Sequence, residues 1–486
     1  MIGIGDTVTE FIVPVKICGA SGNVYNAEAL LKEREKQIGL NEKEYCRISG
    51  KGRIILDFGK EYSGGARILT FTVNKPVAAV RLRFGESLSE ACSEIGEKGS
   101  CNDHSLRDFT TALTAYSDMT FGQTGFRFLR IDFLDDAEIT LKNVYCNFTH
   151  RTFPEAVPFF SDDERINEIY TVAKRTIELC CQEYLWDGIK RDRLVWIGDI
   201  HSEMLALTSL YGRCEIIEKS LDFALAQAPL GEWMNGMPMY SAWWVIIVAD
   251  YAELTGYFSY ASRHVNYIKG LISQFNGYVN EDGELNLPSY FVDWPTHGQP
   301  DENAGCRAVL IYMTEAAGKL LSFLGHEADG AEALRAKLMK PGIHVRSAKQ
   351  VAALKYMALG GLDGEDKALI TAGGAKGMST FMSYYILKAV AETVSEEVAV
   401  SMMKEYYGVM IDKGATTFFE DFDTEWAENS CRIDELPTHG ERDIHGDFGK
   451  YCYLGFRHSF CHGWSSGVLK FLYEYCNKKN KKISVQ

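Results

Sequence analysis

The stretch DGIKRDRLVWIGD, residues 187–199, combines acidic, basic and aromatic side chains within thirteen positions. A solvated loop has no need of so much apolar surface, and a protein core does not tolerate six charges so close together. Two interpretations therefore stay open: an ion-pair network that braces a loop, or the floor of a binding site. The side chains in the stretch that could do chemistry are Asp187, Arg191, Asp192, Trp196 and Asp199.

The residue types in this stretch match the needs of carbohydrate chemistry. Carboxylates that cluster raise one another's pKa, which keeps one of them protonated as a general acid near neutral pH. Arg191 offers forked donors to sugar hydroxyls or to a partner carboxylate, and Trp196 offers an apolar plate to the C–H face of a sugar ring. Asp187, Asp192 and Asp199 cannot share one helix face at their spacing, so they converge only if the stretch is a loop.

Three later segments repeat the combination of acids with aromatic or imidazole side chains. They span residues 281–305, 415–430 and 457–468. Glycoside hydrolysis requires two carboxylates and aromatic stacking, and it needs no cofactor. The sequence therefore predicts a carbohydrate as the partner and no cofactor. The side chains of these segments that could take part are Asp293, Trp294, Glu420 and His462.

The histidines do not form a metal-binding motif. His439, His445, His458 and His462 match no standard zinc spacing. The segment THGERDIHGD, which holds two of them, is typical of a polar loop. We therefore predict that the protein binds no metal.

The bulk composition restricts the partners and the compartment. A formal net charge of −15 disfavours binding to nucleic acids. No stretch reaches the ~18 uninterrupted apolar residues of a membrane span, and the start of the chain lacks the pattern of a secretion signal. The 13 cysteines form no C-x-x-C pair, which is typical of reduced thiols. We expect a cytoplasmic protein, either a monomer or a homo-oligomer.

The hydrophobic period changes about a third of the way along the chain. Short alternating runs, with a break expected at Gly64-Gly65, predict an antiparallel β-sandwich domain over residues 1–155. The period is helical over residues 156–486, the predicted catalytic domain. Ser161 and Glu164 stand at capping-box spacing, which predicts the start of the first helix.

The length of the helical region favours a ring of helix hairpins over a four-helix bundle. About 330 residues fit twelve helices with their loops. We therefore expect a mainly α fold, in which an (α/α)6 toroid (six-hairpin) domain follows the β-sandwich. The loops at one end of such a ring line a central cavity. Residues 187–199 lie between two predicted helices, and this location favours a binding site over a brace.

These segments resemble the bacterial α-L-rhamnosidases, glycoside hydrolase family 78 of the six-hairpin glycosidase superfamily. The family's pattern D-C-P-x-R-(D)-E-R-x-G-W-x-G-D appears here as DGIKRDRLVWIGD. ILDFGKEYSGG, FVDWPT, ATTFFEDFD and SFCHGWSSGVLKFL are similar to further parts of the family, in the same order. The resemblance covers roughly residues 50–475.

The resemblance implies an activity and a role for each residue. The activity is that of an inverting exo-glycosidase on terminal α-L-rhamnosides, or on a related deoxy-sugar or hexoside. Asp192 takes the place of the family's general acid, and Glu420 takes the place of its general base, with the two ~6.5–9.5 Å apart. The side chains that would bind the sugar are Asp187, Arg191, Trp196, Asp199, Asp293, Trp294 and His462.

Two departures from the family pattern leave other functions open. The family's Cys-Pro is Gly188-Ile189 here. Asp192 replaces a Glu, which withdraws the carboxyl group by about 1.5 Å, one C–C bond. Such a displacement is costly to catalysis unless the backbone compensates for it. The alternatives are a non-catalytic carbohydrate-binding homologue on the same fold, or another (α/α)6 enzyme such as an unsaturated uronide hydrolase.

Overall fold

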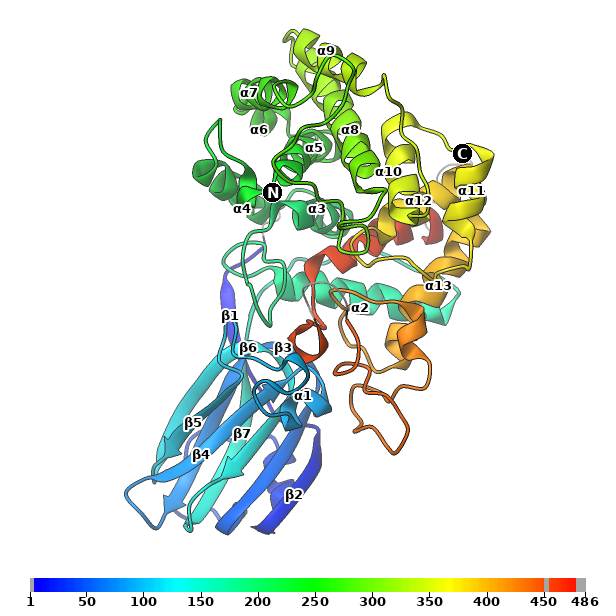
Figure 1. Ribbon diagram of the computed structural model, residues 1–486. Helices are drawn as coiled ribbons and strands as arrows, with labels where there is room; N and C mark the ends of the chain where they lie inside the picture. Colours follow the sequence, from blue (N-terminus) through cyan, green and yellow to red (C-terminus); the bar gives the residue numbers. More distant parts are fainter. Residues whose placement is uncertain (1–3, 450–453, 478–486) are drawn as a thin grey trace.

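A seven-stranded antiparallel sheet forms the first part of the fold, and helices form the second (Figure 1). The computed structural model describes residues 4–449 and 454–477. The strands pair in the order β1-β7-β3-β6-β4-β5, and β2 pairs with β3 outside this path. They are β1 (Thr7–Ile12), β2 (Lys16–Tyr25), β3 (Cys46–Val73), β4 (Ala78–Gly85), β5 (Asp108–Leu113), β6 (Ser117–Phe133) and β7 (Glu138–Arg151).

The predicted β-sandwich is wrong. All seven strands belong to one sheet, which curls into a half-barrel. β3 extends for 28 residues and pairs with β2, β6 and β7 along its length. Alternation in the sequence shows only that each strand buries one face. A curled sheet satisfies that condition as well as two packed sheets do.

The second part begins after β7 and is built from helices and long loops. Figure 1 shows it stacked on one end of the sheet, where the short helix α1 (Leu88–Cys92) also lies. The helices are α2 (Glu164–Cys180), α3 (Ile197–Tyr211), α4 (Glu215–Gln227), α5 (Pro238–Thr255), α6 (Phe258–Ser262), α7 (Val265–Asn276), α8 (Glu302–Phe323), α9 (Asp329–Leu338), α10 (Lys349–Leu359), α11 (Gly364–Thr371), α12 (Ser383–Thr393), α13 (Glu396–Asp412) and α14 (Val468–Phe471).

The predicted mainly α fold with an (α/α)6 toroid is wrong as well. About 42% of the residues are helical and 21% lie in strands, and the helices do not clearly close into a toroid. Their lengths range from 4 residues in α14 to 22 residues in α8. Long loops separate α7 from α8 and α13 from α14. Hydrophobic periodicity reports which face of a helix is buried, but it does not determine how many helices surround a core.

The sheet and the helices have separate apolar cores that meet at their junction. β7 ends at Arg151 and α2 begins at Glu164, while the boundary between domains at residues 155 and 156 stays a prediction. The junction is apolar because side chains of the second part enter the core of the sheet. Those side chains are Leu179, Cys180, Ile189 and Cys461.

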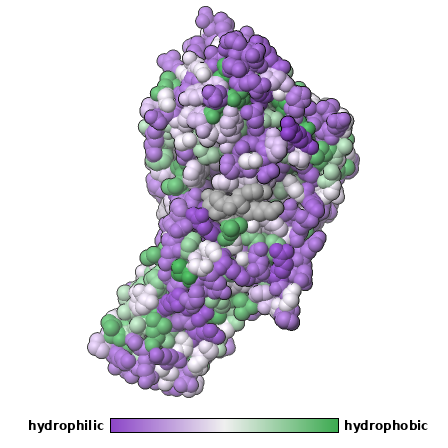
Figure 2. All heavy atoms as spheres, in the orientation of Figure 1, coloured by the Kyte–Doolittle hydropathy of each residue, from purple (hydrophilic) through white to green (hydrophobic). Residues whose placement is uncertain are grey.

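Hydrophilic side chains predominate on the face of the molecule shown in Figure 2. Apolar side chains are scattered over both parts of that face, as is usual on protein surfaces. Within the described residues, no helix combines the length and the apolar character that crossing a membrane requires.

Gly64 and Gly65 lie inside β3 and not at the expected break between strands. A Cβ atom at Gly65 would lie 2.2 Å from the carbonyl oxygen of Gly122 in β6. A Cβ atom at Gly64 would lie 2.2 Å from the carbonyl oxygen of Asn147 in β7. The two glycines therefore allow both neighbouring strands to approach β3 closely.

Replacement of Gly65 by alanine is expected to lower the free energy of unfolding by about 1–3 kcal/mol, because the added methyl group has no room between β3 and β6. Gly19→Ala in β2 is the matched control, since its Cβ atom would meet only the Ile55 side chain, at 3.7 Å. Urea-induced unfolding followed by circular dichroism compares the two variants with the wild type. Equal midpoints for both variants would contradict the steric argument.

Candidate active site

A cavity of about 190 Å³ in the helical part brings together most of the side chains predicted from the sequence. Seven of the nine line it, and Arg191 and Asp293 do not. A larger cavity of about 440 Å³ between α5 and α8 brings together none of them. The residues that line the smaller cavity are Asp187, Asp192, Trp196, Asp199, Met237, Tyr240, Phe291, Trp294, Glu420, His462 and Trp464.

Loops between helices supply most of this cavity wall. The α2–α3 loop carries Asp187, and the first turn of α3 carries Asp199. Trp294 lies in the loop before α8, Glu420 lies in the loop after α13, and His462 lies just before the 3-10 turn that leads to α14. Residues that are far apart in the chain therefore meet in one place, as expected of binding sites built from loops on a rigid scaffold.

The guanidinium group of Arg191 joins the two predicted catalytic residues. Its Nη2 donates to both carboxylate oxygens of Glu420, at 2.5 and 2.6 Å, and its Nη1 donates to Oδ1 of Asp192 at 2.9 Å. Since both carboxyl groups contact one guanidinium, their nearest oxygens lie at most about 8 Å apart, a limit that admits both the ~5–5.5 Å of a retaining and the ~6.5–9.5 Å of an inverting glycosidase. Arg191 thus holds carboxyl groups, where the resemblance implied that it binds sugar.

The backbone at Asp192 is in a left-handed conformation. Asp192 has a φ of 52° and Arg193 a φ of 53°, which side chains other than glycine rarely adopt. Each such residue costs of order 1–3 kcal/mol and persists only where its surroundings enforce it. Here the Arg193 guanidinium donates to the carbonyl oxygens of His104 and Gln123, both in the sheet part. The sheet therefore helps to hold the strained turn that presents Asp192.

Three contacts fix the backbone of Glu420. Its N–H donates to the carbonyl oxygen of Ser459 at 2.9 Å. Its carbonyl oxygen accepts hydrogen bonds from the Thr380 hydroxyl and from Nε1 of Trp464, the latter at 2.8 Å. The Trp464 ring in turn packs on His462, with ring centroids 4.2 Å apart. Glu420 and the aromatic wall of the cavity are therefore positioned together.

Asp293 lies behind the cavity wall. Its Oδ1 accepts hydrogen bonds from the N–H and the hydroxyl of Thr296, and its Oδ2 accepts one from the Ser379 hydroxyl at 2.6 Å. Burial raises the pKa of its carboxyl group, while these hydrogen bonds lower it. Asp293 is thus placed to hold the turn that follows Trp294.

Several residues of the site were not among those predicted from the sequence. Met237, Tyr240, Phe291 and Trp464 complete the cavity wall. His104, from the sheet part, has its Nε2 at 3.4 Å from Oδ1 of Asp192. Phe291 and Trp464 lie inside segments already selected and could have been included, whereas Tyr240 lies in α5, outside those segments. His104 had no such signal, because its role depends on the contact between the sheet and the helices.

Burial controls the charge of the cavity. It raises the pKa of Asp187 and of Asp199 well above the usual range, and the neighbouring carboxylates of Asp192 and Glu203 raise them further. It also lowers the pKa of His462 well below its usual range. His462 stands within 3.7–3.8 Å of carboxylate oxygens of Asp187, Asp199 and Glu420. These shifts favour the uncharged forms of all three groups, which limits the charge that this small space must hold.

A further carboxyl group, that of Glu203, is buried one helical turn behind Asp199. Neither of its oxygens has a hydrogen-bond partner within the described residues, and burial raises its pKa well above the usual range. A Cβ atom at position 463 would lie 1.7 Å from its Oε1, so Gly463 is the residue that leaves room for it. Glu203 is therefore packed against the segment that carries His462.

The chain is similar to known proteins in part of its sequence and in its fold. A model of the bacterial alpha-L-rhamnosidase 6 hairpin glycosidase domain matches residues 154–338. No sequence among the curated proteins matches the chain. The solved structures that resemble it include a rhamnosidase from Klebsiella oxytoca with rhamnose bound, at 18% identity and a TM-score of 0.71, which covers 97% of this chain and 96% of that protein.

Two longer rhamnosidases share the fold. The glycoside hydrolase family 78 rhamnosidase of Bacillus sp. GL1 is 18% identical with a TM-score of 0.69, over 92% of this chain and 48% of that protein. The alpha-L-rhamnosidase of Streptomyces avermitilis, complexed with L-rhamnose, is 16% identical with a TM-score of 0.63, over 87% of this chain and 42% of that protein. This chain spans about half the length of either.

The resemblance to the bacterial α-L-rhamnosidases is confirmed. The matched domain model and these solved structures are those of glycoside hydrolases. At 16–18% identity the solved structures establish a common fold, and the roles of individual residues remain predictions.

At pH 8, Glu203→Gln is expected to be more stable than the wild type. This gain in stability should become smaller as the pH is lowered. The raised pKa means that folded Glu203 holds a proton that the unfolded chain releases above its usual pKa, so stability falls as the pH rises above about 4.5. The amide does not titrate and escapes this loss. Melting temperatures between pH 5 and pH 8 measure the difference.

Glu332→Gln, at an exposed position of α9, is the matched control for replacing a glutamate by glutamine. Its melting temperatures over the same pH range are measured beside those of Glu203→Gln. A difference between Glu203→Gln and the wild type that stays constant from pH 5 to pH 8 would disprove the expectation.

Proposed function

We propose that this protein is an inverting exo-glycosidase that releases terminal α-L-rhamnose, or a related deoxy-sugar, from glycosides. The observation that carries the proposal is the placement of Asp192 and Glu420 at one cavity, held by the single guanidinium of Arg191. The rhamnosidases from Klebsiella oxytoca and Streptomyces avermitilis, which share the fold, hold rhamnose in their structures. This supports a carbohydrate as the ligand of the present cavity.

The size and the walls of the cavity support one small sugar unit as the occupant. A volume of about 190 Å³ is below the ~300 Å³ at which clefts for drug-sized ligands begin. Met237, Phe291 and Trp294 offer apolar surface, which suits the C–H face and the methyl group of a deoxy-sugar. Asp187 and Asp199 offer oxygens to its hydroxyl groups. The enzyme would therefore act on a terminal residue of its substrate.

The two carboxyl groups would divide the chemistry between them. Asp192 donates its proton to the glycosidic oxygen as the bond from that oxygen to the anomeric carbon breaks. Glu420 takes a proton from a water molecule, and the oxygen of this water bonds to the anomeric carbon from the opposite face. The anomeric configuration is inverted. Arg191 holds the two groups in fixed positions relative to each other throughout the reaction.

The backbone at Asp192 supports an aspartic acid as the proton donor. A left-handed residue directs its side chain differently from a residue in an extended loop. The positive φ angles of Asp192 and Arg193 therefore displace the carboxyl group from the position that an ordinary loop would give it. Such a displacement can compensate for the methylene group that Asp192 lacks relative to the family's Glu.

Asp192→Asn and Glu420→Gln should each lower kcat on an aryl α-L-rhamnoside by about 10²–10⁴-fold, because each removes one of the two proton transfers. Release of the aryl group, followed by absorbance, measures the rate. Asp192→Glu should also be slower than the wild type, since the added methylene pushes the carboxyl group away from its position.

The control is Glu425→Gln, an exposed carboxylate in the same acidic loop as Glu420 that pairs with Lys376. Its kcat should equal that of the wild type. Full activity of both Asp192→Asn and Glu420→Gln would refute the assignment. A protein that binds L-rhamnose in calorimetry but cleaves no glycoside would be the carbohydrate-binding homologue, and cleavage of unsaturated uronides alone would identify a uronide hydrolase.

The stereochemistry of the product gives a separate test. An α-L-rhamnoside should release β-L-rhamnose first, because water attacks from the face opposite the leaving group. Proton NMR of the anomeric signals in the first minutes of reaction distinguishes the two anomers before they equilibrate. Initial release of the α-anomer would exclude the inverting mechanism.

A further inference from the structure

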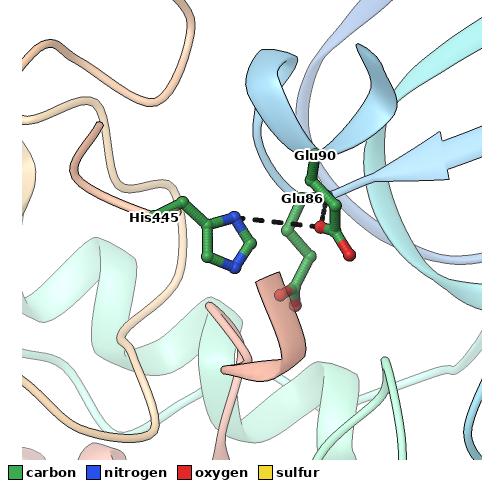
Figure 3. A group of neighbouring side chains, drawn as sticks. All are labelled: Glu86, Glu90 and His445. Atoms are coloured by element: carbon green, nitrogen blue, oxygen red, sulfur yellow. Dashed lines mark hydrogen bonds and ion pairs between the residues drawn. The ribbon is translucent and has the colours of Figure 1, made fainter. Parts of the chain in front are cut away.

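A buried polar network joins the sheet part to the loops that carry Arg191 and Glu420. Its centre consists of Glu86, Glu90 and His445, which Figure 3 shows facing one another across the junction. Glu86 directly follows β4, Glu90 lies in α1, and His445 comes from the loop after α13. All three are buried. None of them lines the cavity.

Lys190 links the two glutamates of the network to the loop that carries Arg191. Nζ of Lys190 lies 2.8 Å from Oε1 of Glu90 and 3.3 Å from Oε2 of Glu86. It also donates to the carbonyl oxygens of Phe456 and His458, at 2.6 and 2.9 Å. This ammonium group supplies the positive charge that the two buried carboxylates require. Lys190 directly precedes Arg191 in the chain, so the network also anchors the residue that holds Asp192 and Glu420.

The same three side chains could hold a metal ion by their spacing, since their ligand atoms lie within 4.8 Å of one another. The contacts present favour another function. Lys190 already neutralises the carboxylates. The two ring nitrogens of His445 are engaged with the Ser87 hydroxyl, at 2.8 Å, and with the carbonyl oxygen of His458, at 2.9 Å. We therefore read the cluster as a structural junction.

Glu86 reaches from the sheet to the immediate neighbour of Glu420. Its Oε2 accepts a hydrogen bond from the N–H of Phe460 at 2.7 Å, and its Oε1 accepts one from the Ser459 hydroxyl at 3.1 Å. The N–H of Ser459 donates to Oε2 of Glu420 at 3.1 Å, and the N–H of Glu420 donates to the carbonyl oxygen of Ser459 at 2.9 Å. One residue, Ser459, thus separates Glu86 from the predicted general base.

We infer that Glu86 is a positioning residue for this enzyme: by binding Ser459 and Phe460, it fixes the carboxylate of Glu420 in its catalytic orientation. The inference rests on the proposed function for the role of Glu420. It makes the sheet a part of the active site, although no strand reaches the cavity. Displacement of a catalytic group by as little as 1 Å lowers rates by about 10²-fold, so a contact one residue away matters.

The cost of the network supports a positioning role. Burial raises the pKa of the Glu86 carboxyl group to about 7, and the charge of Lys190 opposes this rise. Placing two glutamates and a lysine in a buried junction is no more stabilising than apolar packing of similar volume. Four acceptors around one ammonium group do, however, define a single geometry for the loops that they join.

The test compares Glu86→Ala and Glu86→Gln with Asp108→Ala in the full-length protein. Asp108 is a buried carboxylate of the same sheet, paired with Arg81, and it does not contact Ser459 or Phe460. We expect Glu86→Ala to lower kcat on an aryl rhamnoside by roughly 10–100-fold with little change in KM. Glu86→Gln, whose amide oxygen can still accept from Phe460, should stay within about threefold of the wild type, and Asp108→Ala should keep its kcat.

Hydrogen exchange provides a readout that does not depend on turnover. The amides of residues 456–463 should exchange faster in Glu86→Ala than in the wild type, and at the wild-type rate in Asp108→Ala. If Glu86→Ala does not fold, Glu86→Asp takes its place, because it keeps the charge but withdraws the carboxylate from Phe460. A lower kcat and faster exchange in that variant would support the inference equally.

Two results would overturn the inference. One is unchanged kcat and unchanged exchange in Glu86→Ala, and the other is an equal loss of kcat in Glu86→Ala and Asp108→Ala. A wild-type protein that cleaves no glycoside would refute the proposed function. The exchange rates of residues 456–463 would then still decide whether Glu86 fixes the segment beside Glu420.

Discussion

The proposed active site depends on one guanidinium group placed between two acidic side chains. Asp192 and Glu420 belong to loops more than 220 residues apart, and both face a cavity of about 190 Å³. Arg191 donates hydrogen bonds to both side chains, and these bonds fix their separation and orientation in this small space. A planar guanidinium presents its donors in fixed directions, so it can contact both side chains with a defined geometry. The contacts that fix Arg191 therefore also fix the positions of Asp192 and Glu420.

The surrounding structure supports Arg191 from several directions. Its Nε donates to the carbonyl oxygen of Arg457, and the preceding Lys190 is fixed by two glutamates of the sheet part. The following residue, Asp192, is held in a left-handed turn by Arg193, which also binds the sheet part. The sheet thus contacts both sides of Arg191 without entering the cavity. This explains why the junction between the two parts contains charged groups as well as an apolar core.

The sequence could predict the site because its residue types are informative in themselves. Acids, an arginine and aromatic residues were concentrated in a few segments, and seven of the nine predicted side chains line one cavity. Asp293 belongs to the same segment as Trp294, but its side chain lies behind the cavity wall. The position of a residue along a loop does not determine the direction of its side chain. Glu86 and His104 could not be found, because a single glutamate at the end of a strand becomes informative only once the helices are docked on it.

The fold was predicted less well than the site, for a related reason. Helical periodicity located the helical part of the chain, yet the first helix is capped by Asp163, whose side chain accepts from the N–H of Arg165, and not by Ser161. Gly64 and Gly65 suggested a turn, whereas they permit the close approach of two strands to β3. Periodicity records that a face is buried and not what buries it. A sandwich and a curled sheet produce the same alternation of apolar and polar residues in the sequence. Acid catalysis, by contrast, requires carboxyl groups in any fold that can bring them to a cavity, so residue type predicts the site even where the fold is not known.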